Sequence, residues 1–409
     1  MKLWIINQYA SKPDVAGLTR HYELAKRLTV RGIETLVVHG SFDLYLKNRH
    51  WSDQISTEKK AVMSQFDGVY FLTIPTPPYR NNRSIGRIHS MFAFRGHAYK
   101  EMMSGKHGKP DVVMGSTMTL FGADAARRLA TRFSVPFIYE VRDLWPLTPI
   151  EIGGHSKWHP FLLYLDYLDG KMAKAADLVI TTAPLMKEYY KERFGLPDEK
   201  FLWITNGTDL ELFKSSDYAL ESEKTTFDLY YTGSLGLANG LDKIFDQLPP
   251  VQKKFPQFRL VLVGDGPLRQ HLKERAFSEG LPVKFMDPVP KTELPAVLSK
   301  ADACLIYLKP SKLYRFGISA NKLADYHAAA KPVLFVGDCT ENPVTRAGSG
   351  IVAEGIDHFP DALEEMIACR PEKRKEMGAK ARAFAEEHYD WDKLADKLAT
   401  HLTQICAHR

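Results

Sequence analysis

Residues 260–272 read LVLVGDGPLRQHL, an apolar run that changes abruptly into a glycine-containing turn and then into a helical pattern. The run LVLV has the composition of a buried parallel strand. Gly264 and Gly266 permit a sharp turn after it, and Pro267 suits the first helical position because its missing N–H would be unpaired there. Open α/β sheets bind ligands at such turns, although a tight connection without a ligand would have the same sequence.

The alternation of short β-branched runs and longer helical patterns extends through the chain and then begins again. The strands that we expect are 3–7, 34–39, 111–114, 137–140 and 178–182 in the first half, and 227–232, 259–263, 283–286, 303–307 and 332–336 in the second. The expected helices include 19–31, 123–132, 241–247, 268–279, 293–300 and 320–330. This alternation predicts the α/β class, with two Rossmann-like, doubly wound parallel-sheet domains that face a cleft.

A chain of 409 residues suits two domains. We place the first domain at residues 1–208, the second at 209–385 and a terminal helical segment at 386–409. The polar stretch 214–226 has the composition of a linker. The terminal segment is amphipathic at the helical period, so we expect it to pack back on the first domain.

The composition is that of a soluble globular protein, with 44% hydrophobic and 25% charged residues. No apolar run approaches the ~20 residues that cross a bilayer, and we expect no signal peptide at the start. The four cysteines form no CxxC pair, which predicts no metal site and no disulfide framework, and favours the cytoplasm. The net charge of +6 suits an anionic ligand or membrane surface, and we expect no nucleic-acid partner.

A second glycine-rich turn lies at residues 230–243, YYTGSLGLANGLDK, after an expected strand. Free N–H groups and the helix dipole both favour phosphate at a turn that leads into a helix. The spacing is not GxGxxG and no GxxxxGK[ST] occurs, so a dinucleotide fingerprint and a P-loop are disfavoured. The turn therefore predicts an anion site of another kind.

Residues 319–335, SANKLADYHAAAKPVLF, predict a helix capped by Ser319 or Asn321 and followed by a strand. Lys322 and Asp325 fall on one helical face. Lys322 lies in the first turn, where a cation is unfavourable unless an anion such as a diphosphate compensates it. Asp325 can accept hydrogen bonds from a ribose diol. The alternative is an ordinary i,i+3 ion pair on a solvated face.

These stretches resemble those of a known family. GDGPLRQHL, YTGSLGLANGLD, NGTDLELF at 206–213 and NKLADYHAAAKPV are similar to motifs of family 4 glycosyltransferases of the GT-B fold. Residues 6–38 and YEVRDLWP at 139–146 resemble the WbuB-type branch of bacterial surface-polysaccharide sugar transferases. The resemblance implies a hexosyltransferase (EC 2.4) that moves a sugar, with retention, from a nucleotide sugar to an acceptor hydroxyl. The donor is a substrate, so neither cofactor nor metal is expected.

The resemblance also implies which residues form the site, and this chain departs from the family at several of them. Family members carry two glutamates separated by seven residues, whereas Gly317 takes the first position here and Asp325 the second. A histidine common in the first domain is replaced by Ser116, which we assign to the acceptor. The expected donor contacts are Gly17, Gly233, Ser234, Leu235, Asn239, Asn321, Lys322 and Asp325.

Ser234 and Asn239 stand where the family places an Arg and a Lys on the phosphates, so Lys322 is inferred to supply the positive charge. Retention without a clear carboxylate nucleophile suggests same-face attack, in which the leaving diphosphate takes the acceptor proton. Lys322, the N–H groups of the 233–236 turn and the loop at Gly17 are expected to stabilise that diphosphate. Gly17 suits a plain turn nearly as well.

Asp143, in VRDLWP, follows the expected strand at 137–140 and is our second catalytic candidate, as a group that orients the acceptor or a donor hydroxyl. Arg142 is expected to bind an acceptor phosphate. The alternative for Asp143 is a helix cap in a loop that ends at proline.

Residues 79–103 mix arginines with aromatic residues. Ile88, Phe92, Tyr99 and Met102 fall near one helical face, with basic residues around it. Such a helix can contact an anionic membrane on its cytoplasmic side and meet a polyprenyl-linked acceptor, although a helix packed within the domain or a saccharide acceptor fits as well.

Two other functions remain open from the sequence. A UDP-sugar 2-epimerase of the same fold would need acid/base groups in the cleft, and a non-catalytic scaffold would bind nucleotide sugars without turnover. Incubation with UDP-GlcNAc alone separates the first alternative from a transferase, because only the epimerase would turn over without an acceptor.

Overall fold

The computed structural model describes residues 1–13, 19–42, 60–81, 84–214 and 225–407. The chain forms two compact units, one of residues 1–205 with 391–409 and the other of residues 206–390. It passes into the second unit slightly before residue 208, where we placed the boundary, and leaves it slightly after residue 385. The terminal segment thus belongs to the first unit.

Of the stretch 214–226, which we predicted as a linker, residues 215–224 lie outside the described residues. The chain enters the second unit before this stretch, at residue 206. The chain before it already bonds within that unit. The N–H of Asn206 donates to Ser319 Oγ at 2.9 Å, and Thr208 Oγ1 donates to the Asp325 carboxylate at 2.8 Å. Polar composition indicates exposure, but it does not by itself mark a domain boundary.

The first unit contains an eight-stranded sheet in the order β3-β4-β2-β1-β5-β6-β7-β8, parallel except between β3 and β4. The strands are β1 (Lys2–Ile6), β2 (Glu34–Gly40), β3 (Val62–Phe66), β4 (Val69–Ile74), β5 (Val112–Ser116), β6 (Phe137–Val141), β7 (Leu178–Thr181) and β8 (Phe201–Trp203). All five strands predicted for this half occur, because each is a short apolar run that the sheet buries.

We did not predict the antiparallel hairpin of β3 and β4 from the sequence. Asp67 and Gly68 join its strands, with φ angles of +47° and +81°. Positive φ at both central residues is what a tight type I′ turn requires, and Asp-Gly is a preferred sequence for it. The Asp-Gly pair is the feature of the sequence from which the hairpin could have been predicted.

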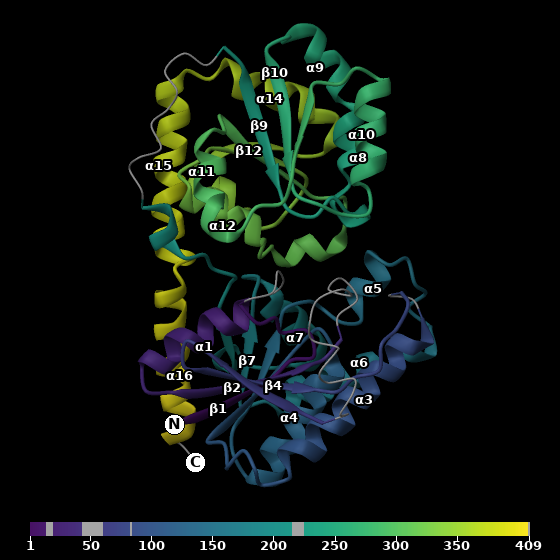
Figure 1. The fold of residues 1–409 in the computed structure, drawn as a ribbon, viewed down its shortest axis with the longest axis vertical. Helices are drawn as coiled ribbons and strands as arrows, with labels where there is room; N and C mark the ends of the chain where they lie inside the picture. Colours follow the sequence, from purple (N-terminus) through teal and green to yellow (C-terminus); the bar gives the residue numbers. More distant parts are fainter. Residues whose placement is uncertain (14–18, 43–59, 82–83, 215–224, 408–409) are drawn as a thin grey trace. The chain divides into compact units, whose positions relative to one another are not determined.

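Helices cover both faces of this sheet (Figure 1). They are α1 (Arg20–Val30), α3 (Ile85–Met102), α4 (Leu120–Phe133), α5 (Leu147–Glu151), α6 (Pro160–Ala175), α7 (Met186–Phe194) and α16 (Trp391–Ala407). Leu3 and Ile5 of β1 join the hydrophobic cluster formed with α1 and α16. Trp4 points to the other face and meets Phe133 of α4 edge-on, with ring centroids 5.4 Å apart. The period of two along β1 thus supports one helix layer on each face.

The second unit contains a six-stranded, wholly parallel sheet in the order β11-β10-β9-β12-β13-β14. Its strands are β9 (Phe227–Thr232), β10 (Phe258–Val263), β11 (Val283–Met286), β12 (Ala303–Tyr307), β13 (Val333–Val336) and β14 (Gly350–Ala353). The sequence predicts the first five of these and misses β14. Two parallel-sheet α/β units confirm the predicted fold class.

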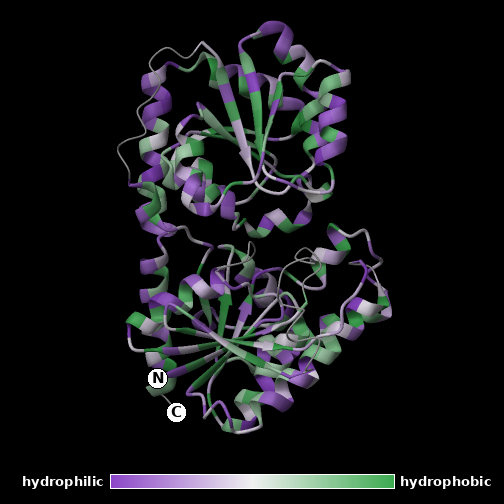
Figure 2. Ribbon diagram, in the orientation of Figure 1, coloured by the Kyte–Doolittle hydropathy of each residue, from purple (hydrophilic) through white to green (hydrophobic). Residues whose placement is uncertain are grey.

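The helices of the second unit form two layers around strands that are largely hydrophobic (Figure 2). They are α8 (Leu241–Asp246), α9 (Leu248–Lys254), α10 (Arg269–Ser278), α11 (Leu294–Ser299), α12 (Asn321–Ala328), α13 (Pro343–Ala347), α14 (Phe359–Ala368) and α15 (Pro371–His388). Tyr231 of β9 packs in the cluster with α8, α9, α10 and α14. Tyr230, its neighbour, packs in the cluster with α11 and α12.

At the carboxyl end of this sheet, the turns after β9 and β10 meet backbone to backbone. A Cβ atom on Gly264 would lie 2.0 Å from the carbonyl O of Gly233, and one on Gly266 would lie 2.7 Å from the backbone of Leu235. Gly264 also has a φ of +148°, which residues with side chains rarely adopt. The glycines of the GDG sequence therefore permit a close approach of two turns.

The substitution Gly264→Ala is expected to destabilise the protein by about 2–4 kcal/mol, because the new methyl group has no space and the φ is strained. Gly96→Ala is the matched control: a Cβ there meets nothing within 4 Å, and the residue lies inside α3. The control should stabilise by ~0.5–1 kcal/mol. Calorimetric unfolding temperatures test this, and equal temperatures for the two variants would contradict it.

Candidate functional site

The turn after β9 provides fewer free N–H groups than the sequence suggests. The N–H of Gly233 donates to Val263 O at 2.9 Å, and the N–H of Leu235 donates to Asp265 O at 2.8 Å. The Leu235 side chain is buried in the core. Our expectation that the Gly233 and Leu235 amides bind a donor needs correction, since both already have acceptors. Within the described residues, the amide of Ser234 is the one of the three that donates to no protein group.

Asn239 stabilises the turn and does not project freely from it. Its Nδ2 donates to Ser234 O at 2.8 Å, and Tyr231 Oη donates to the same carbonyl at 3.0 Å. Gly233 and Ser234 are exposed, so a ligand can reach them. Of the predicted turn residues, Ser234 is thus the one placed to contact a donor directly, and Asn239 supports it.

Lys322 lies beside this turn. Its Nζ donates to Tyr231 Oη at 2.6 Å, and a Cβ on Gly233 would lie 3.5 Å from Lys322 Cε. No carboxylate of the described residues forms an ion pair with Lys322. Burial lowers the pKa of this amine to about 7. The sequence prediction that brings Lys322 to the glycine turn agrees with this geometry, and the partner Tyr231 was not foreseen.

The start of α12 differs from the predicted cap. Ala320 is the cap residue, and no side chain caps the helix. Ser319 instead accepts the N–H of Asn206, and its carbonyl accepts Asn206 Nδ2 at 2.9 Å. Asn321 is exposed at the first helical position. The expected Ser319 or Asn321 cap is therefore wrong, because Ser319 bonds to a distant segment.

Asp325 is buried and already paired. Its Oδ1 accepts from Thr208 Oγ1 at 2.8 Å and forms an ion pair with Lys291 Nζ. Lys322 and Asp325 lie on α12 as predicted but contact different partners, so the described residues do not contain the i,i+3 ion pair that was the alternative. A ribose hydroxyl would have to approach the second carboxylate oxygen, Oδ2. Lys291 and Thr208 were missed because they lie far away in sequence.

Two further glycines bear on the expected donor site. Gly17 lies outside the described residues. Gly317, which stands where the family has its first glutamate, ends a short 3-10 helix with a φ of +79°. That conformation suits glycine, so the missing carboxylate coincides with a backbone turn that a glutamate would not adopt readily.

In the first unit, polar residues gather at the carboxyl ends of β5 and β6. Glu140 is fully buried and accepts from Arg20 Nε (2.9 Å), His21 Nε2 (2.7 Å) and Ser116 Oγ (2.6 Å). Burial alone would raise the pKa of Glu140, but the charges of Arg20 and His21 hold it well below its usual value. Glu140, Arg20 and His21 were not among the predicted residues, although YEV and TRHYEL contain them.

This network alters the role expected for Ser116. Its hydroxyl donates to Glu140, and the residue is fully buried. Ser116 therefore supports the network and is not exposed to an acceptor. Arg20 also donates to the carbonyls of Thr205 and Ile204, which ties α1 to the end of this unit's chain segment.

Arg142 and Asp143 follow β6 directly. The N–H of Arg142 donates to Thr117 Oγ1 at 2.8 Å, while its buried Nη1 has no hydrogen-bond partner among the described residues. Burial lowers the pKa of Arg142 and raises that of Asp143. Pro146, without a side-chain bond, is the cap of α5, so Asp143 is not a helix cap. A partly buried cation with an unused N–H fits the predicted anion-binding role.

Residues 79–103 contain α3, whose buried side chains include Met91, Phe94, Ala98 and Met102 and which packs against α4. Of the four residues predicted near one face, Met102 is buried, and Ile88 and Tyr99 are partly buried. Phe92, expected on that face, is 39% exposed and lies 4.5 Å from the ring of Phe121. The helix packs within the first unit, as our alternative stated.

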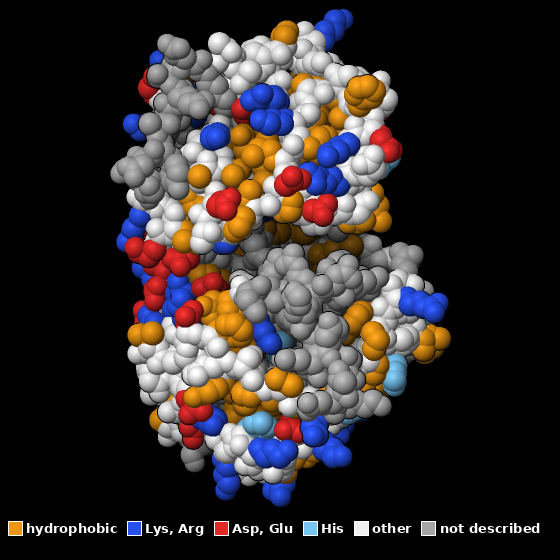
Figure 3. Space-filling view, in the orientation of Figure 1, with side chains coloured by type: hydrophobic (Ala, Val, Ile, Leu, Met, Phe, Trp, Pro, Cys, Tyr) orange, Lys and Arg blue, Asp and Glu red, His pale blue; other side chains and the backbone are white. Residues whose placement is uncertain are grey.

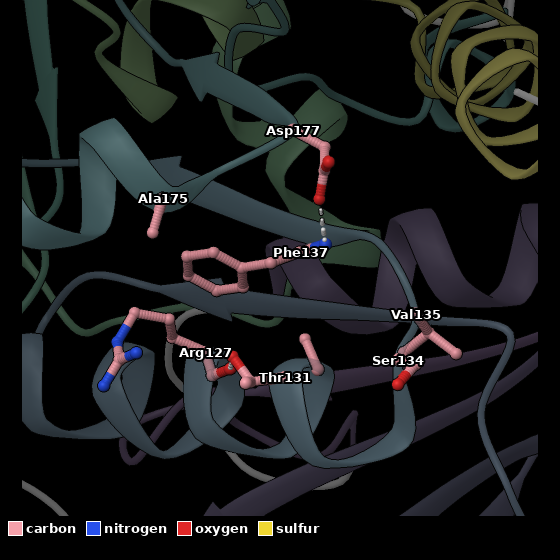
Figure 4. Close-up of a pocket in the computed structure, with 8 residues that line it drawn as sticks. Arg127, Thr131, Ser134, Val135, Phe137, Ala175 and Asp177 are labelled. Carbon is pink, nitrogen blue, oxygen red and sulfur yellow. Dashed lines mark hydrogen bonds between the residues drawn. The ribbon is translucent and has the colours of Figure 1, made fainter. Parts of the chain in front are cut away.

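One hollow of about 300 Å³ lies elsewhere in the first unit (Figure 4). Asp177, which lines it, accepts the N–H of Phe137 at 2.8 Å. Phe137 begins β6, so the hollow lies at the opposite strand end from Arg142 and Asp143. Ligands of parallel sheets bind at the carboxyl ends, and we therefore exclude this hollow from the candidate site.

The described residues hold no group of three or more His, Cys, Asp or Glu side chains arranged to bind a metal ion. No helix among them has the length and apolar character to cross a membrane.

Similarity to known proteins agrees with this architecture. Residues 16–212 match the family described as Glycosyltransferase Family 4, and residues 226–369 match Glycosyl transferases group 1. A GDP-mannose-dependent alpha-(1-6)-phosphatidylinositol monomannoside mannosyltransferase of Mycobacterium tuberculosis is 25% identical over 57% of this chain and 63% of its own length. Glycogen synthase of the same organism is 23% identical over 94% of this chain and 90% of its own.

Among solved structures, sucrose-phosphate synthase of Thermosynechococcus elongatus superposes with a TM-score of 0.76 at 16% identity, covering 100% of both chains. WaaG, a glycosyltransferase involved in lipopolysaccharide biosynthesis, gives a TM-score of 0.67 at 13% identity over 98% of this chain and 100% of its own. These likenesses concern the fold. Together with the two family matches they show that the chain belongs to the glycosyltransferases, with a family 4 domain followed by a group 1 domain on a GT-B fold.

Proposed function

We propose that this protein is a retaining hexosyltransferase that moves a sugar from a nucleotide sugar to a saccharide or polyprenyl-linked acceptor in cell-surface polysaccharide assembly. The observation that carries the proposal is Lys322, an amine without a carboxylate partner that lies beside an exposed glycine turn at the carboxyl end of a parallel sheet. The assignment to the WbuB-type branch rests on the resemblance alone.

In the proposed reaction, the bond between the sugar and the diphosphate breaks and a bond forms from the acceptor oxygen to the same face of the sugar. The leaving diphosphate takes the acceptor proton, so no separate base is required. Negative charge grows on the diphosphate as its bond to the sugar breaks, and Lys322 with the Ser234 N–H would stabilise it. Asp143 would orient the acceptor or a donor hydroxyl, and Arg142 would bind an acceptor phosphate.

The nucleotide of the donor could be a guanosine or a uridine diphosphate. The mycobacterial relative is named for GDP-mannose, and the solved structure of HepE from Anabaena holds UDP and glucose. A thermal-shift comparison of UDP-sugars with GDP-sugars tests the proposal, since a ligand that binds the native state raises its apparent stability. Turnover without an acceptor would indicate an epimerase, and binding without any turnover would indicate a scaffold.

Lys322→Ala is expected to lower kcat with the true donor by about 10²–10³, as the loss of a preorganised donor at a developing charge does in other enzymes. Lys253→Ala removes an exposed lysine from α9, in the same unit, and should leave kcat unchanged. Steady-state transfer of labelled sugar measures both. Unchanged transfer by Lys322→Ala would refute the donor-site assignment.

Donor binding is expected to weaken as the pH rises above about 7, because burial lowers the pKa of Lys322 to about 7 and only the ammonium form attracts diphosphate. Binding of the anion should raise that pKa, so binding takes up a proton. Donor affinity between about pH 6 and 9 tests this, with Lys322→Arg as the control, since arginine stays charged throughout. A wild-type affinity that decreases no more than that of the arginine variant would contradict the prediction.

We also propose a peripheral contact with the cytoplasmic face of a membrane. Residues 157–171, which include most of α6, offer a more exposed aromatic surface for it than α3. Trp158, Leu163 and Tyr167 are 71%, 48% and 61% exposed. Lys157 Nζ lies 5.2 Å from the ring centre of Trp158, and Lys171 Nζ lies 5.6 Å from that of Tyr167. Figure 3 shows hydrophobic side chains beside basic ones and histidines where α3, α5 and α6 lie in Figure 1. Aromatic residues interleaved with lysines suit an anionic bilayer surface.

The double variant Trp158→Ala/Tyr167→Ala should bind vesicles of phosphatidylcholine and phosphatidylglycerol several-fold more weakly than the wild type, because the apolar contact is lost. Phe277→Ala is the control, since Phe277 is 91% exposed in the second unit and has no part in this surface. Vesicle cosedimentation measures both. Equal binding by the wild type and the double variant would exclude the α6 contact.

A further inference from the structure

Tyr231 connects the catalytic lysine to the glycine turn. Its hydroxyl oxygen accepts a hydrogen bond from Lys322 Nζ at 2.6 Å, and its O–H donates to Ser234 O at 3.0 Å. The Lys322 Nζ lies 3.8 Å from the centre of the Tyr231 ring. The ring is 1% exposed in the hydrophobic core, so packing fixes where the hydroxyl lies.

The groups that Tyr231 connects border one exposed space. Gly233 contributes no side chain to it, and an added Cβ would lie 3.6 Å from Lys322 Nζ. The Ser234 carbonyl is held from two sides, by Tyr231 and by Asn239 Nδ2, which fixes the conformation of the turn. The Ser234 N–H and the lysine ammonium are therefore held as neighbours before any ligand binds.

We propose that Tyr231 is a positioning residue for the donor diphosphate, which deepens and rests on the proposed function. An ammonium group has three N–H donors. Tyr231 holds one of them, and the other two remain for phosphate oxygens beside Ser234. The phenol stays buried and does not touch the donor.

Lysine needs such a partner because its side chain is a flexible four-carbon stem with a compact charge at the end. A free stem would lose rotamer freedom when the donor binds, and that loss weakens binding. A stem already held by Tyr231 avoids this loss. Asn239 Nδ2 still holds the Ser234 carbonyl when the Tyr231 hydroxyl is removed. The effect of Tyr231 on the donor should therefore pass mainly through Lys322 and should vanish when the lysine is absent.

A double-mutant cycle tests the inference. UDP and GDP binding to the full chain is measured by titration calorimetry for wild type, Tyr231→Phe, Lys322→Ala and the double variant. Tyr231→Phe keeps the ring and should weaken binding of the preferred nucleotide about tenfold, whereas the double variant should bind no more weakly than Lys322→Ala. The decline of binding at alkaline pH should also move to lower pH in Tyr231→Phe, because the ammonium loses a hydrogen-bond acceptor.

Tyr230→Phe is the matched control, since Tyr230 is adjacent on β9 and its ring packs in the other hydrophobic cluster. It should bind like the wild type. Additive losses in the double variant, or unchanged binding by Tyr231→Phe, would overturn the inference while the donor site stands. If the wild type bound neither UDP nor GDP, the proposed function would fail and this inference with it.

Discussion

The backbone contact between the turns after β9 and β10 determines what the second unit can offer a ligand. No side chain fits between Gly264 and the carbonyl of Gly233, and the close approach lets the Gly233 and Leu235 amides bond to the neighbouring strand end and turn. Those two amides are then unavailable to an anion. Of the three amides at residues 233–235, the one of Ser234 remains as a donor among the described residues, so further stabilisation of an anion would have to come from a cation. Lys322 lies beside this turn and is the cation that the proposed donor site uses.

Glu140 differs from Lys322 and Arg142 in how completely its buried charge is paired. Glu140 has three hydrogen-bond donors, two of them from basic side chains, and its burial is therefore balanced. Glu140 connects α1 to β5 and β6 and has a structural role. Among the residues that the structure describes, Lys322 has a neutral acceptor, Tyr231 Oη, and no carboxylate partner, and the buried Nη1 of Arg142 has no hydrogen-bond partner. Such incompletely satisfied cations carry an energetic cost that an anionic ligand would remove.

The sequence predicts the strands well and the site only in outline. A parallel strand is an apolar run of four to seven residues, and its identity depends on local composition, so ten of the strands were found where expected. The contacts of Asp325 and Ser319 were not foreseen, because their partners come from distant segments. Asp325 meets Thr208 and Lys291, and Ser319 meets Asn206. Whether an amide is free also depends on the neighbouring turn, which no local pattern reveals.

The pair of Lys291 and Asp325 affects the charge beside the proposed donor site. Lys291 neutralises the carboxylate that stands in the family's second acidic position, and Gly317 removes the first. Asp325 therefore adds little repulsion toward a diphosphate, and no carboxylate of the described segments pairs with Lys322. An amine with a pKa of about 7 is partly neutral in the free protein, and a bound diphosphate would raise that pKa and favour the ammonium form. The free protein thus avoids part of the cost of burying the charge by losing the proton, and in the proposed complex the diphosphate would offset the rest.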